Sequence, residues 1–100
     1  MNDLMAKTKT ASYFEIDFYV LDGIIKEEYG QDFSFVANQE AQNHTDHAFY
    51  IDGQLTDYCR AKLSRWKETG DGSFMTISLL NDLAARGRIK RGNWIVRVSW

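Results

Sequence analysis

The sequence predicts an α+β domain in which two helices pack on one face of a small antiparallel sheet. Two segments, residues 13–20 and 94–100, alternate apolar and polar side chains, which is typical of strands with one buried face. Between them, apolar residues over 54–86 recur at helical spacing instead. One hundred residues, of which 44% are apolar, are enough for a single domain with one core.

The chain begins with a polar, unpatterned stretch. We therefore expect residues 1–11 to form a flexible N-terminal arm ahead of a single α+β domain over residues 12–100. The first predicted strand covers Tyr13–Val20. An Asp-Gly pair after it favours a tight turn. Residues 23–29 are equally consistent with a short helix that ends at Gly30, and this choice stays open.

Five further elements follow in order. Residues 32–37 and 47–52 are predicted to be strands, separated by a polar stretch. Apolar residues at helical spacing then predict helices over Gln54–Lys67 and Met75–Arg86, each followed by a glycine that can end it. The alternation over Trp94–Trp100 predicts a final strand.

The two end strands are expected to share one core with the two helices, because their apolar faces match in length. The predicted core residues are Phe14, Ile16, Phe18, Leu63, Trp66, Leu80, Leu83, Trp94, Val96 and Val98.

Cysteine use and hydropathy suggest a cellular compartment. The single cysteine, Cys59, cannot form an internal disulfide, which fits a reducing environment. No apolar run approaches the roughly 18 residues that span a bilayer, and the first residues lack the apolar stretch of a signal peptide. We therefore expect a cytoplasmic protein with no membrane partner.

No group of residues has the pattern of a catalytic or metal site. His44, Asp46 and His47 resemble a ligand cluster, but a structural zinc site usually needs four Cys or His ligands. Cys59 lies on the apolar stripe of its helix, which predicts a buried, inert thiol. Phosphate-binding loops and nucleophile elbows are absent from the sequence. We predict a protein without enzymatic activity, metal or cofactor.

The charges are distributed unevenly along the chain. Residues 1–58 hold eleven carboxylates against three lysines, a balance of −8, and residues 59–100 hold nine basic groups against three acidic ones, a balance of +6. Such an asymmetry can mark a partner surface. It is equally consistent with two halves that neutralise each other in the fold.

The basic half resembles a winged-helix DNA-binding domain. Residues 76–96 contain a Leu-rich helix, a glycine, a Gly-Asn turn and a strand, the order of a recognition helix and wing. The resemblance implies that the basic side chains after the helix contact phosphates. These are Arg86, Arg88, Lys90 and Arg91.

The whole chain resembles small accessory proteins of bacteriophages and other mobile elements, a group that includes anti-CRISPR and anti-restriction inhibitors. The resemblance lies in its size, in the acidic and aromatic segment 13–20, in residues 33–51 and in the ending over 92–100. It implies a protein that binds a host protein or nuclease complex through carboxylates that stand in for nucleic-acid phosphates.

That resemblance leads to the main functional prediction, inhibition of a host complex without catalysis, with a winged-helix regulator as the alternative. An acidic aromatic surface would supply negative charge and tyrosine anchors. Its predicted residues are Tyr13, Glu15, Asp17, Tyr19, Asp22, Glu27 and Glu28. Tyr13 and Tyr19 are also consistent with simple coverage of a sheet face.

Overall fold

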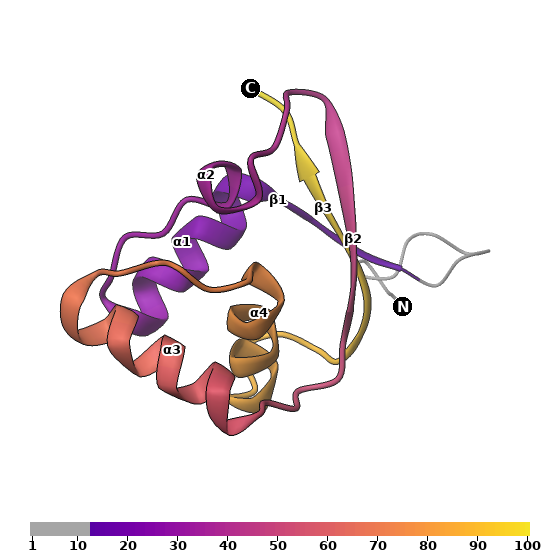
Figure 1. The fold of residues 1–100 in the computed structure, drawn as a ribbon. Helices are drawn as coiled ribbons and strands as arrows, with labels where there is room; N and C mark the ends of the chain where they lie inside the picture. Colours follow the sequence, from indigo (N-terminus) through magenta and orange to yellow (C-terminus); the bar gives the residue numbers. More distant parts are fainter. Residues whose placement is uncertain (1–12) are drawn as a thin grey trace.

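The computed structural model describes residues 13–100 and has an α+β architecture (Figure 1). The elements, in chain order, are β1 (Phe14–Asp17), α1 (Phe18–Tyr29), α2 (Phe35–Gln39), β2 (Thr45–Ile51), α3 (Asp57–Thr69), α4 (Thr76–Ala85) and β3 (Gly92–Val98). The predicted arm over residues 1–11 lies outside the described part of the chain. No helix in residues 13–100 is long and apolar enough to cross a membrane.

The sheet is mixed, whereas the sequence predicted a purely antiparallel one. The strand order is β1-β3-β2, so the C-terminal strand lies in the centre. β3 runs parallel to β1, with Ile16 opposite Val96, and antiparallel to β2, with His47 opposite the same valine. A parallel pair needs a long crossover, and the helices between β1 and β3 provide one. Alternation along a strand does not encode its direction, which is why the prediction failed here.

The first predicted strand is too long. It ends at Asp17, and Phe18–Tyr29 form helix α1. Leu21 and Ile25 are its buried residues, four positions apart on one side of the helix. Gly30 ends the helix in the left-handed region with φ of 71°, and its N–H donates to the carbonyl of Lys26 at 2.8 Å. The open choice for residues 23–29 is therefore settled as helix.

The second predicted strand, over residues 32–37, is also wrong. Phe35–Gln39 form the short helix α2, and Ser34 caps it by accepting the N–H of Ala37 at 3.1 Å. Phe35 is fully buried under the sheet, with its ring centroid 6.0 Å from that of Phe49 on β2. The capping serine and this contact outweigh the short apolar run that suggested a strand.

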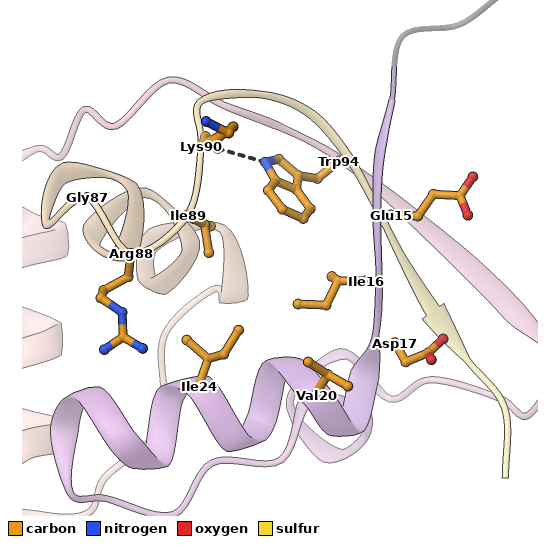
Figure 2. Close-up of a pocket in the computed structure, with 10 residues that line it drawn as sticks. All are labelled: Glu15, Ile16, Asp17, Val20, Ile24, Gly87, Arg88, Ile89, Lys90 and Trp94. Carbon is orange, nitrogen blue, oxygen red and sulfur yellow. Dashed lines mark hydrogen bonds between the residues drawn. The ribbon is translucent and has the colours of Figure 1, made fainter. Parts of the chain in front are cut away.

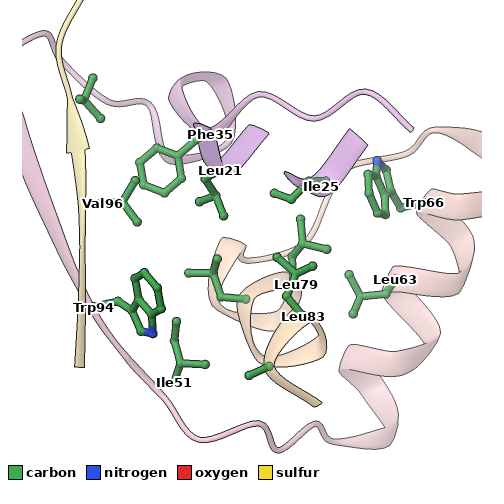
Figure 3. Packing of buried hydrophobic residues seen from close by; sticks show 13 residues of the cluster. Leu21, Ile25, Phe35, Ile51, Leu63, Trp66, Leu79, Leu83, Trp94 and Val96 are labelled. Atoms are coloured by element: carbon green, nitrogen blue, oxygen red, sulfur yellow. The ribbon is translucent and has the colours of Figure 1, made fainter. Parts of the chain in front are cut away.

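The other elements agree with the prediction within a few residues, and the helices lie on one side of the sheet (Figure 1). Figure 3 shows the core between them. Of the predicted core residues, those on α3, α4 and β3 are buried. Phe14, Ile16 and Phe18 are only partly buried, because they lie at the edge strand and at the start of α1. The prediction missed Leu21, Ile25, Phe35, Ile51 and Leu79.

Candidate binding surface

The face of the sheet opposite the helices is the candidate binding surface, here called the outer face. Its side chains alternate with the buried ones along each strand. They are Glu15 and Asp17 from β1, Asn93, Ile95 and Arg97 from β3, and Asp46, Ala48 and Tyr50 from β2. Within residues 13–100, the helices cover only the other face (Figure 1).

Arg97 is the central charge of the outer face. Its guanidinium donates to Asp46 at 3.1 Å and lies 3.4 Å from a carboxylate oxygen of Glu15. The hydrogen bond to Asp46 raises the pKa of Arg97, and the charges of Asp46, Glu15 and Asp17 raise it further. Among the described residues, three carboxylates therefore surround one guanidinium, and the outer face carries an excess of negative charge.

Two tyrosines of this region have exposed side chains. Tyr50 on the outer face is 66% exposed, and Tyr19 at the start of α1 is 62% exposed. Asp17 is the last residue of β1 and the N-cap of α1, where its exposed carboxylate forms no capping hydrogen bond. Tyr13 is half-buried. The structure thus places Glu15 and Asp17 on one face of β1 and leaves Tyr19, two residues after Asp17, exposed; that these residues bind a partner stays a prediction.

A groove adjoins the outer face at β1. It has a volume of about 630 Å³ and lies between β1, α1 and the loop 87–90. Figure 2 shows its apolar lining, formed by Ile16, Val20, Ile24, Ile89 and Trp94. Glu15 and Asp17 border the groove, with their carboxylates turned away from the apolar lining (Figure 2).

The remaining acidic residues of the predicted surface lie elsewhere. Glu27 and Glu28 are at the far end of α1, about 16 Å from Asp17 along the helix axis. Arg88 lies 2.9 Å from Glu27 and 2.5 Å from Glu28. Hydrogen bonds from Arg88 and then from Arg86 lower the pKa of Glu28. Here the two halves of the chain do neutralise each other.

Asp22 forms a hydrogen bond within the protein. Its carboxylate accepts the backbone N–H of Phe35 at 3.0 Å and so connects α1 to the start of α2. Burial raises the pKa of Asp22 to about 6, although the hydrogen bond from Phe35 acts in the opposite direction. This residue is part of the fold's internal contacts.

Some of the basic residues of the winged-helix alternative pair with carboxylates, and others do not. Arg86 and Arg88 are engaged with carboxylates of α1 and α4. Arg91 lies against Gly53, where an added Cβ would come 2.5 Å from its Nε. Lys90 is exposed, and its backbone carbonyl accepts the indole N–H of Trp94 at 2.8 Å.

Helix α4, the recognition helix of that alternative, has its polar groups in internal contacts. Asn81 accepts the N–H groups of Asp52 and Gly53, each at 3.0 Å. Asp82 accepts the Tyr29 hydroxyl and the Arg86 guanidinium. A recognition helix must enter the major groove. Because α4 packs between α3 and the sheet (Figure 3), this arrangement does not favour the alternative.

The two histidines and Cys59 do not form a metal-binding cluster in residues 13–100. His47 turns to the inner face, 5.4 Å from the ring of Phe35, whereas His44 is exposed in a turn with φ of 61°. Residues 13–100 contain no group of three or more His, Cys, Asp or Glu side chains placed to hold a metal.

Cys59 was predicted to be buried but is only partly buried. It lies in the first turn of α3, and Ser78 donates a hydrogen bond to its sulfur at 3.1 Å. This bond and one from Thr56 lower the pKa of the thiol. The spacing of the apolar residues therefore overestimated the burial of Cys59 near the N-terminus of α3.

Comparison with known proteins gives no match. No protein-family model, no curated protein and no solved structure is significantly similar to the chain. The surface is therefore interpreted from its own geometry. Asp46, Tyr50 and Arg97 were not assigned to the binding surface from the sequence, although alternation along 45–51 and 92–98 indicates that each points to the outer face.

Proposed function

We propose that this protein is a non-catalytic binding protein that docks its outer face on a basic surface of a host protein complex. The observation that carries the proposal is the excess of carboxylates over cations on that face among residues 13–100, together with the exposed Tyr50 on the same face and the exposed Tyr19 at the start of α1. Complementary charge speeds association and selects the partner, and tyrosines are frequent energetic anchors of interfaces.

The more specific form of the proposal is inhibition of a host nuclease complex, as anti-CRISPR proteins do. Its support is the resemblance of the sequence to phage accessory proteins, together with the spacing of the carboxylates. Asp17 and Asp46 lie on strands either side of β3, so their strands are about 10 Å apart. Negative charges over such a band suit a surface that otherwise binds nucleic-acid phosphates.

Affinity capture from a lysate of bacteria that carry defence nucleases tests the proposal. The double variant Asp17→Lys/Asp46→Lys reverses the outer face and should lose the proteins that the wild type captures. Both side chains are exposed, so the fold should persist. The matched control is Glu68→Lys, which makes the same kind of change on the exposed side of α3.

Capture that depends on Asp17 and Asp46, survives in the Glu68→Lys variant and weakens in high salt would support the proposal. Equal capture by the double variant would overturn it. Binding of duplex DNA that is lost in a Lys90→Glu variant would instead favour the nucleic-acid-binding alternative.

A further inference from the structure

The groove beside β1 is open yet lined by large apolar side chains. Val20 is 42% exposed, and Ile16, Ile24 and Ile89 are only partly buried, so no element of residues 13–100 covers this lining completely. The volume of about 630 Å³ lies within the usual range of pockets that take a ligand group.

Several contacts hold the walls of the groove in place. The indole of Trp94 is fixed by its hydrogen bond to the carbonyl of Lys90 and by the ring of Phe14 at 5.1 Å. The loop 87–90 is tied to α1 by the ion pairs of Arg88 with Glu27 and Glu28. A pocket with preformed walls binds without a large ordering cost.

The groove is continuous with the outer face, because Glu15 and Asp17 belong to both. We infer that the groove is the anchor site for one large apolar side chain of the partner protein, next to a Lys or Arg that pairs with Asp17. This inference rests on the proposed function and specifies how the partner is recognised. The partner segment would combine an aliphatic or aromatic residue for the groove with a cation for the acidic edge.

Charge determines the choice of partner segment. Asp17 is exposed at the end of β1, and Glu15 lies on the same face, so a cation beside the anchor gains attraction while a carboxylate there is repelled. Lys90 lies on the opposite side of the groove and would repel a cation of the partner segment. The segment should therefore bind with its cation at the Asp17 side.

The test uses the full chain, labelled for NMR, and three short blocked peptides. One contains Leu beside a single lysine, the second has Ala in place of Leu, and the third has Leu beside a single glutamate. The first should shift the indole N–H signal of Trp94 and the methyl signals of Val20 and Ile24. The Ala peptide should bind roughly tenfold more weakly or worse, because it leaves the groove unfilled. The Glu peptide should also bind more weakly.

Two variants complete the test. Val20→Glu places a charge in the groove and should abolish the shifts there, whereas Met75→Glu, an equal change at an exposed apolar residue of the α4 N-cap, should preserve them. Equal binding of the Leu and Ala peptides, or no groove shift at any peptide, would overturn the inference.

The two proposals can fail separately. If the lysine peptides shift Asp46 and Tyr50 but not the groove signals, the anchor site is wrong while the acidic outer face stands. If the groove responds only after Lys7 and Lys9 are changed to Glu, residues 1–12 of the chain compete for the site, and the assignment to a partner is overturned.

Discussion

The two faces of the sheet differ in burial and charge, as two neighbouring residues of β3 show. Val96 points to the inner face and is 1% exposed, packed under the helices. Arg97 points the other way, among carboxylates of β1 and β2. The inner face provides stability through burial, whereas the helices of residues 13–100 leave the outer face uncovered. The fold, and not the sequence order of the charges, therefore decides where one sign of charge is left in excess.

The largest expected effect tests the inner face. Phe35→Ala removes a fully buried ring that packs against Phe49 and His47 of β2, and we expect a loss of roughly 3–5 kcal/mol in the free energy of unfolding. The matched change on the outer face, Tyr50→Ala, should cost at most about 0.5 kcal/mol. Urea denaturation of both variants measures the difference. Similar losses would show that the outer face is covered.

A smaller effect is expected from Asp22, which lies inside the region that the sequence assigned to the partner. Its folded pKa of about 6 is above the ordinary value of 3.8, so the native state holds the proton more tightly than the unfolded chain does. Stability from this group is therefore present at low pH and lost as pH rises through about 6.

The variant Asp22→Asn isolates that contribution, since its amide oxygen can still accept the N–H of Phe35. At neutral pH, Asp22→Asn should be more stable than the wild type by about 1 kcal/mol, after allowance for solvent around a half-buried group. The difference should shrink below the wild-type pKa. Thermal melts across this pH range provide the measurement, and a pH-independent difference would contradict the assigned cause.

The smallest stability effect is expected at the centre of the outer face. Arg97→Gln breaks ion pairs between partly exposed groups, so unfolding should change by about 0.5 kcal/mol or less. The same variant removes the cation that opposes three carboxylates. It should therefore bind a basic partner more tightly and associate faster, which stopped-flow or surface-binding kinetics can measure.

Part of this arrangement could be predicted from the sequence. Alternation correctly predicted that Glu15 and Asp17 lie on the polar side of β1 and that Val96 lies on the buried side of β3. A repeat of two depends only on local strand geometry. The same pattern wrongly extended the predicted strand over Phe18–Val20, because apolar residues two positions apart also occur at the start of a helix. Phe35 was assigned to a strand from a short apolar run. Its packing against β2, which is distant in sequence, could not be inferred from that run.

The charge pairing was less predictable. Whether a carboxylate is neutralised depends on contacts between distant parts of the chain, and Arg88 and Glu28 are 60 positions apart. The prediction therefore grouped Glu28 and Asp17 in one surface. In the fold, Arg88 neutralises Glu28, whereas Asp17 is exposed. Asp46 and Tyr50 join that surface only through the register of β2 with β3.

The central claim is that the outer face binds a basic surface, and the salt dependence of association with a captured protein tests it most directly. Association rates of the wild type and of Asp17→Lys/Asp46→Lys should be compared as ionic strength rises. We predict a wild-type rate that falls steeply with salt, a much slower double variant with little salt dependence, and a Glu68→Lys control that follows the wild type. Equal rates and equal salt dependence for the wild type and the double variant would contradict the claim.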